Sequence, residues 1–208
     1  MLDALIKGGW VMLPLVVCSL TAVAVSIEKL LFLRRISISD HADKVVTFVM
    51  KEQLNEALTI SQGTQSPLLH VLSAGIAQRC NSSKAMEAAA IVEVDNMKRG
   101  LPILDTIITL SPLLGLLGTI IGMISSFQVM SVAGMGQPHA VTGGIAEALI
   151  ATATGIIVAI VTLIPYNYFL ARIERETTKI EHYATRLEMA LDTPFYRSDK
   201  HEDIKKFA

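Results

Sequence analysis

The feature that most constrains this chain is a long stretch with almost no charge. Between Asp105 and Arg172 the only residue charged at neutral pH is Glu147. An acid is costly at membrane depth and commonly has a functional role there. The residues around it are mostly small, and small residues let membrane helices approach closely. The stretch therefore predicts membrane helices that handle ions, not a soluble enzyme.

Turn-forming residues divide this stretch in two. Gly134, Gly136 and Pro138 interrupt it, which predicts spans over residues 106–132 and 143–170 joined by a turn at 133–142. A separate apolar run at residues 8–27 has about the 20 residues that a helix needs to cross a bilayer. A cleaved signal peptide is the alternative for this run. Its positive charges follow the run and its apolar core is long for such a peptide, so we interpret it as a retained anchor.

The basic residues predict the orientation. Of the 18 Lys and Arg residues, nine lie from Lys29 to Arg99, eight from Arg172 to Lys206, and the last is Lys7. Positively charged segments stay preferentially on the cytoplasmic side. We therefore expect residues 1–7 on the outer side of the membrane and residues 28–105 and 171–208 in the cytoplasm.

Both cytoplasmic segments are predicted to be helical. Apolar residues at helical spacing predict one helix from Val45 to Leu58, and a second helix follows the turn signal at Pro67. A third helix, with an N-cap around Asn81, is expected to continue into the second span with bends at Pro102 and Pro112. The tail at 172–191 continues the third span. The expected fold is an all-α membrane protein with three transmembrane helices and long cytoplasmic helical extensions.

Small and hydroxyl residues form one stripe on each of the last two spans, since at about 100° per residue each set falls on one face. The stripe on the second span is Ser111, Gly115, Gly118, Thr119, Gly122 and Ser126, and that on the third is Ala148, Ala151, Thr152, Gly155, Ala159 and Thr162. Glu147 lies roughly a quarter turn away from the third-span stripe, almost in line with Thr154.

Two interpretations of these stripes stay open. In the first, they serve tight helix packing, with Gly115, Gly118, Gly122, Ala148, Ala151, Gly155 and Ala159 as contact residues. Glu147 is then an acid stabilised by the dipole at the start of a helix. In the second, a ring of identical chains places the hydroxyls and the acid around a shared axis. The polar path through the bilayer would then be lined by Thr119, Glu147, Thr152 and Thr154.

Composition argues against other functions. The net charge of −1 gives no electrostatic basis for binding nucleic acid. Cys18 lies in an apolar run and Cys80 in a polar segment, so we expect no disulfide between them. The chain has no hydrolase triad, P-loop, Cys-x-x-Cys motif or cluster of metal ligands. We therefore expect no enzyme activity, metal or cofactor.

Two segments carry a resemblance to a known family. They are LLGTIIGMISSF at residues 116–127 and GIAEALIATATG at residues 144–155, and the similarity extends to IPYN at 164–167. This part of the chain, roughly residues 112–167, resembles the MotA/TolQ/ExbB proton-channel family. Elsewhere only the layout of anchor, helical loop and helical tail is similar. Three spans resemble the ExbB and TolQ branch more than the flagellar stator, which has four.

The resemblance implies a homopentameric ring in the bacterial inner membrane. Such a ring encloses a single-span partner of the ExbD/TolR type, whose transmembrane aspartate takes up and releases protons, and it acts on a TonB- or TolA-type protein. Thr119 and Thr152 would line the proton route and Glu147 would be the acid of the third span, while Thr154 adds a hydroxyl where small apolar residues are more usual. The expected function is an ExbB-like motor subunit that uses the proton motive force to energise TonB-dependent outer-membrane transport. A TolQ-like subunit for envelope integrity and division, or a passive scaffold, stays open.

Overall fold

The computed structural model describes residues 9–36, 40–62, 66–133 and 138–192, and all of the regular structure in these residues is helical. Three helices are long and apolar enough to cross a membrane, over Met12–Arg34, Leu101–Ser131 and Thr142–Leu191. The prediction of an all-α protein with three candidate spans is therefore confirmed. The segment 1–7, the turn residues Gly134 and Gly136, and the end of the tail lie outside the described residues.

The chain divides into two compact units, each built from two stretches of sequence. The apolar unit is Met1–Leu30 with Gly100–Phe169, and the charged unit is Leu31–Arg99 with Leu170–Ala208. Two helices contribute to both units. They are α2, Met12–Ile36, and α8, Pro138–Leu191.

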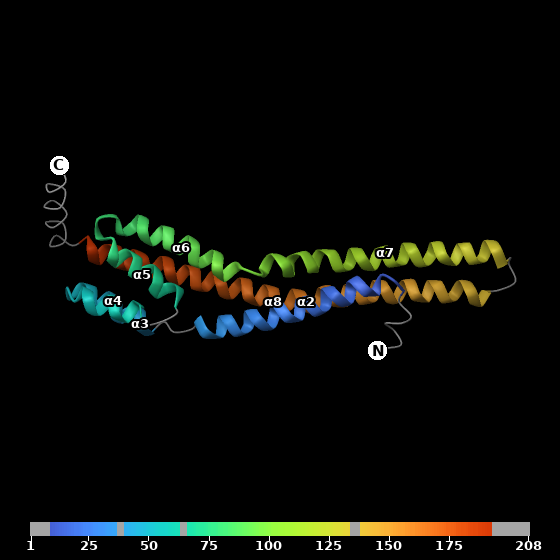
Figure 1. Ribbon diagram of the computed structural model, residues 1–208, viewed down its shortest axis with the longest axis horizontal. Helices are drawn as coiled ribbons and strands as arrows, with labels where there is room; N and C mark the ends of the chain where they lie inside the picture. The colour runs from blue at the N-terminus through green and yellow to red at the C-terminus, as the bar shows by residue number, and fades with distance from the viewer. Residues whose placement is uncertain (1–8, 37–39, 63–65, 134–137, 193–208) are drawn as a thin grey trace. The chain divides into compact units, whose positions relative to one another are not determined.

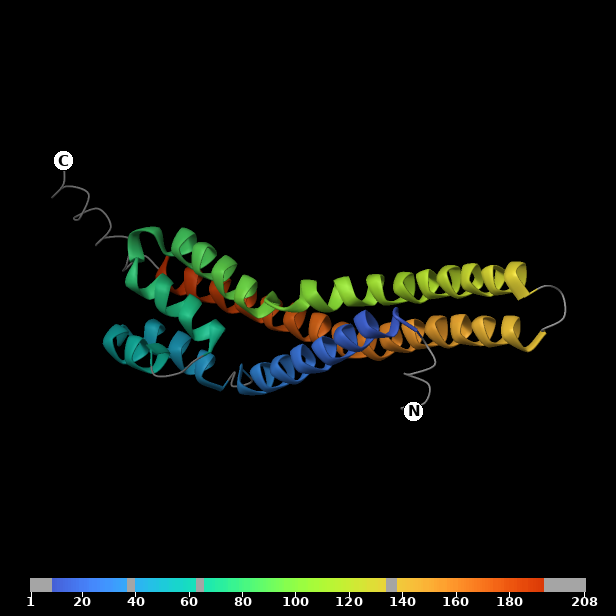
Figure 2. The same cartoon turned by 45° about the vertical axis from the view of Figure 1, so that its right-hand side comes forward.

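The apolar unit contains α7, Leu101–Ala133, together with the first parts of α2 and α8. In this unit α7 runs antiparallel beside α8, and α2 lies against the same pair (Figures 1 and 2). Val11, Met12 and Leu15 at the start of α2 form a buried cluster on Leu114 of α7 and Ile150 of α8. Pro112 and Pro165 lie inside α7 and α8, and both helices continue through them.

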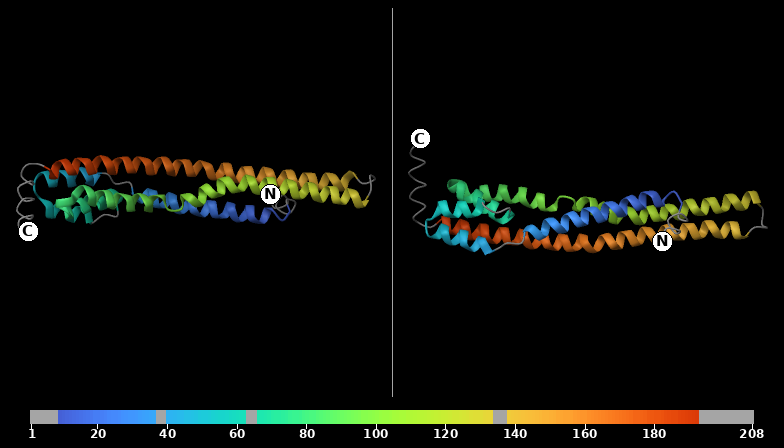
Figure 3. Two further views of the ribbon diagram at one scale, coloured as in Figure 1. Left: turned by 90° about the horizontal axis from the view of Figure 1, so that it is seen from above. Right: turned by 60° about the horizontal axis from the view of Figure 1, so that its bottom comes forward.

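The charged unit contains four helices and one short 3-10 turn together with the second part of α8. They are α3 (Asp40–Met50), α4 (Leu54–Gln62), α5 (Pro67–Ala77), η1 (Arg79–Asn81) and α6 (Ser82–Lys98). On α8, Ile173, Ile180 and Leu187 are buried at every seventh residue, a spacing that keeps apolar side chains on one side of a helix. Figure 3 shows the same helices from two further directions.

Two breaks in the helices differ from the sequence prediction. The helix expected from Val45 to Leu58 is divided into α3 and α4, and Glu52 between them has a positive φ of 66°. The helix expected to run from Asn81 into the second span ends at Lys98, and α7 begins at Leu101. Gly100 between them has φ 87°. Pro102 then falls in the first turn of α7, where its missing N–H leaves no helical hydrogen bond unmade. Asn81 is the N-cap residue of α6, but its side chain makes no capping hydrogen bond.

Gly100→Ala is expected to lower the free energy of unfolding by about 1–2 kcal/mol, because an L-residue with a side chain is strained at positive φ. A methyl group there meets only Val25 Cγ1 at 3.4 Å, an ordinary contact, so the effect is one of backbone strain. Thermal unfolding of the purified chain in detergent measures it. Glu52→Gly is the matched reverse change and is expected to leave stability unchanged or raised. A lower melting temperature for Glu52→Gly than for Gly100→Ala would contradict this account.

Asp43 joins α3 to α8 in the charged unit. The Tyr183 hydroxyl donates to its Oδ2 at 2.9 Å, and Arg186 Nη1 donates to its Oδ1 at 2.8 Å. The bond from Arg186, and then that from Tyr183, lower the pKa of the Asp43 carboxyl below its ordinary value of 3.8. A group whose pKa falls on folding stabilises the fold above its unfolded pKa. That contribution disappears as the pH falls through the lower, folded pKa.

Asp43→Asn is therefore expected to lower the melting temperature slightly at neutral pH. The difference from wild type should shrink as the pH falls below about 4. The effect is small because the Asp43 side chain is 61% exposed and exposed ion pairs contribute little. Melting curves of both proteins across this pH range measure it. A difference that stays constant down to the lowest pH would show that the carboxylate charge is not responsible.

Candidate functional site

The candidate site is built on the contact between α7 and α8, which we call the seam. Small residues of the two helices meet along it in five antiparallel pairs. The pairs are Ser111 with Gly155, Gly115 with Thr152, Gly118 with Ala151, Gly122 with Ala148, and Ser126 with Gly144. Ala159, further along α8, is also buried. The residues that the sequence assigns to packing therefore lie in or beside one contact.

The seam brings backbone against backbone. A Cβ atom built on Gly155 would stand 2.5 Å from the Ser111 carbonyl oxygen, and one built on Gly122 would stand 2.9 Å from the carbonyl oxygen of Gly144. Both distances are shorter than real Cβ contacts, and the opposing atoms belong to a helix backbone that cannot turn aside. Glycine is required at these positions because the helices approach so closely, as small-x-x-x-small patterns allow in membranes.

A hydrogen bond crosses the seam at Thr152. Its hydroxyl donates to the Gly115 carbonyl oxygen at 2.9 Å, although Gly115 already lies within a helix. Nearby, the buried Ser126 hydroxyl donates to Gly122 in its own helix at 2.9 Å. Ser111 Oγ is buried and has no partner among the described residues. The seam thus holds polar groups in a segment that is otherwise apolar.

The other two threonines of the predicted polar path bond to their own helices. The Thr119 hydroxyl donates to Leu116 O at 2.7 Å, and the Thr154 hydroxyl donates to Ile150 O at 2.8 Å. Such bonds satisfy a hydroxyl inside an apolar segment. Both side chains are half-buried. Thr152 is the one member of the predicted path that directly joins α7 to α8 within the described residues.

Glu147 lies beside the seam and is half-buried. Its carboxylate contacts Gly9, so closely that a Cβ on Gly9 would overlap Glu147 Oε1. Gly9 has φ 68° and comes just before the first turn leading into α2. Ile150, one turn further along α8, packs on the start of α2. The structure therefore places Glu147 on the side of α8 that faces α2, whereas Thr152 faces α7.

Two of these contacts were not predicted from the sequence. The pairing of Gly144 with Ser126 extends the seam by one turn, and the four-residue spacing from Gly144 to Ala148 was a usable signal for it. The contact between Glu147 and Gly9 joins residues far apart in sequence, so no local pattern could indicate it. Among the described residues, no group of three or more His, Cys, Asp or Glu is placed to hold a metal ion.

Comparison with known proteins decides the family. The profile of the MotA/TolQ/ExbB proton channel family matches residues 41–182. The chain belongs to this family. A Synechocystis relative named biopolymer transport protein ExbB-like 1 is 34% identical over 207 residues, covering 94% of this chain and 81% of the relative. The Tol-Pal system protein TolQ of Pseudomonas aeruginosa is 36% identical over 117 residues, covering 56% of this chain and 51% of TolQ. The biopolymer transport protein ExbB of Salmonella typhimurium is 35% identical over 125 residues, covering 60% of this chain and 48% of ExbB.

These relatives place the chain in the ExbB and TolQ branch of the MotA/TolQ/ExbB proton channel family. The family assignment and the three apolar helices together establish a multi-pass membrane protein. The family is one of proton channels associated with transport and not a known family of enzymes. The seam and Glu147 both lie within the matched residues.

Proposed function

We propose that this protein is the proton-channel subunit of an inner-membrane motor that energises TonB-dependent outer-membrane transport. Five copies form a ring around the transmembrane helices of a single-span partner of the ExbD/TolR type. The partner's aspartate exchanges protons with a path lined by Thr119, Glu147, Thr152 and Thr154. The ring then drives a TonB-type protein. The N-terminus lies in the periplasm, and residues 28–105 and 171–208 lie in the cytoplasm.

One observation carries this proposal: the only charged residue between Asp105 and Arg172 is an acid, and it stands beside a seam that contains hydroxyl groups. An acid in this position, half-buried on a membrane helix, is expensive to keep without a role. One glutamate and three hydroxyls make a short proton path for a whole bilayer. An acid supplied by the partner helix completes it. The relatives named ExbB-like, which match 94% and 88% of this chain, support the transport role.

Deleting the gene is expected to abolish energised uptake of a ferric siderophore in a strain without a redundant homologue. The wild-type gene should restore uptake. Thr152→Ser, which keeps a hydroxyl that can reach Gly115, should restore most of it. Thr152→Val has nearly the same shape without the hydroxyl, and we expect uptake roughly tenfold lower, the equivalent of about 1.4 kcal/mol. Each variant is compared at equal protein level in the membrane.

Two results would count against the proposal, the first against the transport role and the second against the proton path. Normal uptake in the deletion strain would remove the ExbB-like role. Full rescue by Thr152→Val would leave Thr152 as a packing residue only. The TolQ-like role is the second candidate, because TolQ of Pseudomonas aeruginosa matches 56% of this chain. Leakage of periplasmic protein and chains of undivided cells in the deletion strain, with siderophore uptake intact, would favour that role.

A further inference from the structure

The second part of α8, in the charged unit, carries two rows of opposite charge. The acidic row is Glu174, Glu181 and Glu188, and the basic row is Arg172, Lys179 and Arg186. Residues seven apart lie almost two full turns apart on a helix, so each row follows one side of α8. At about 100° per residue the two rows are separated by roughly 160° and lie on opposite flanks.

The acidic row borders a groove between α6 and α8. The groove has a volume of about 750 Å³, and its lining includes Glu181 and Glu188 from α8 with Glu87 and Asp95 from α6, against one cation, Lys98. Two aliphatic side chains of α6 in this groove, Ile91 and Val92, are 65% and 59% exposed. Among the described residues, no carboxylate of the acidic row is in an ion pair. This flank is therefore both negatively charged and partly apolar, and no other part of the chain that the structure describes covers Ile91 or Val92 fully.

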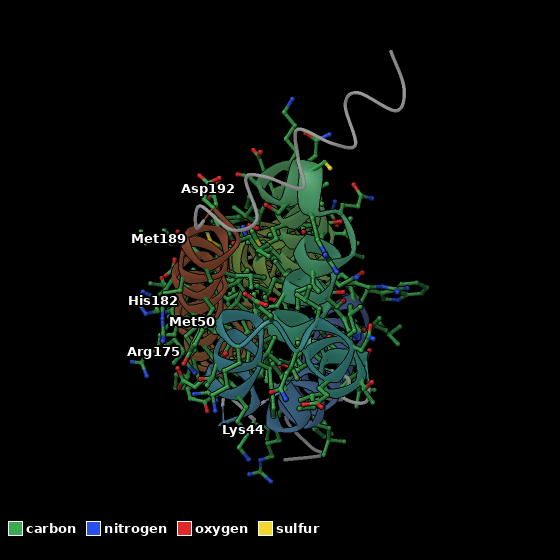
Figure 4. The ribbon with its side chains drawn as sticks, turned by 90° about the vertical axis from the view of Figure 1, so that its left-hand side faces the viewer. Lys44, Met50, Arg175, His182, Met189 and Asp192 are labelled. Atoms are coloured by element: carbon green, nitrogen blue, oxygen red, sulfur yellow. The ribbon has the colours of Figure 1, made fainter. Side chains whose placement is uncertain are left out.

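The basic row carries a surplus of positive charge. Lys179 and Arg172 share the Glu176 carboxylate at 3.0 and 3.6 Å, and Arg186 pairs with Asp43 at 2.8 Å. Two carboxylates thus serve three cations. Arg175 adds a fourth cation beside the row, and Figure 4 shows it projecting from the same outer side of α8 as His182 and Met189. Met189 is 69% exposed, which gives this side an apolar group as well.

We propose that the acidic row of one copy of this chain docks on the basic row of the next copy. The two rows have the same seven-residue spacing and are offset by only two residues, 172 to 174, 179 to 181 and 186 to 188. In two parallel α8 helices at the same height, the members of each of the three opposite pairs therefore lie only about 3 Å apart along the axis, two residues of helical rise, which long charged side chains can bridge. A second copy of this chain therefore carries opposite charges at the spacing that the contact needs.

This contact is heterologous, since different flanks of the same helix meet. Each copy keeps one acidic and one basic flank, so the association continues from copy to copy until a ring closes. The inference rests on the ring in the proposed function and names the surface that forms it outside the membrane. Ile91, Val92 and Met189 lie where the contact would cover them.

Disulfide cross-linking in native membranes tests this contact. In full-length protein carrying Cys80→Ser, which removes the exposed native thiol, Arg186→Cys and Glu188→Cys are introduced singly and together. After mild oxidation, the double variant should give a ladder of dimers and larger multimers on a non-reducing gel, and reductant should collapse it. Each single variant should give none, because a heterologous contact joins the two flanks and never one flank to itself. The pair Glu181→Cys with Glu188→Cys, both on the acidic row, is the matched control and should also give no ladder.

The mass of the detergent-extracted complex is measured for each variant, so that loss of assembly is recognised. A ladder from the control pair or from a single variant would overturn the inference. It would show that a row contacts the same row of the next copy and not the row of opposite charge. A complex of several copies with no ladder would overturn it while leaving the ring in place. A single-copy mass for the wild type would overturn the inference and the proposed ring together.

Discussion

Gly155→Ala is expected to push α7 and α8 apart. The added methyl group would stand 2.5 Å from the Ser111 carbonyl oxygen and 3.1 Å from Gly115 Cα, and neither backbone atom can move without displacing its helix. Overpacking of this kind costs about 1–3 kcal/mol, and more where the opposing atoms are rigid. It must also exceed the gain of about 1 kcal/mol that alanine brings over glycine inside a helix. Thermal unfolding of the purified chain in detergent should show a clear loss of melting temperature.

The control for this change is Gly143→Ala on the same helix. A Cβ on Gly143 meets nothing within 4 Å, so only the helix propensity changes. Its melting temperature should stay level or rise. The two variants differ in position alone, and any effect of glycine replacement in general cancels between them. If Gly155→Ala melts no lower than Gly143→Ala, the close approach of the two backbones at Ser111 is wrong.

Glu147→Gln is expected to stop proton-driven transport while leaving the protein assembled. Glutamine has nearly the size of glutamate and can occupy the same place against Gly9, but it cannot take up or release a proton. Removal of a proton-transfer group commonly costs about 10²–10⁴ in rate, so we expect siderophore uptake to fall by roughly 100-fold or more. Protein level and the mass of the extracted complex should match wild type.

Two further variants separate charge from contact at Glu147. Glu147→Asp keeps the acid on a shorter side chain and should retain part of the uptake. Gly9→Ala keeps the acid but fills its place, because the new Cβ would overlap Oε1, and φ 68° at that residue is strained for alanine. We expect Gly9→Ala to lower stability. Wild-type uptake by Glu147→Gln would instead leave Glu147 as an acid that stabilises the helix beside it.

Much of the fold could be predicted because the bilayer imposes a length and a polarity on each span. The charge-free stretches identify the three apolar helices, and the tail from Arg172 continues α8 to Leu191 because no Pro or Gly interrupts it. The break lies at Gly100 and not at Pro102, where a bend is predicted, because a proline in the first turn of a helix leaves the helical hydrogen bonds undisturbed. The break at Glu52 has no such residue to signal it. Glu52 takes its positive φ although it is neither glycine nor asparagine, the residues that usually signal such a conformation.

The candidate site was predictable only where it depends on helical spacing. The repeat of Gly115, Gly118 and Gly122 indicates a face along α7, and the structure puts that face against α8. Spacing does not say which way a hydroxyl donates or what an acid touches. The bond from Thr152 to Gly115 and the contact of Glu147 with Gly9 depend on how two helices are placed in space. Only the folded chain determines these.

The three threonines of the proposed path have each already committed their single hydroxyl hydrogen. Thr119, Thr152 and Thr154 all donate to backbone carbonyl oxygens, which can only accept. What each hydroxyl still offers is lone pairs. A lining of lone pairs with one carboxylate orients water with its hydrogens toward the wall, which favours hydronium and repels chloride or hydroxide. Selectivity for cations over anions would then follow from the hydroxyls as much as from the charge of Glu147.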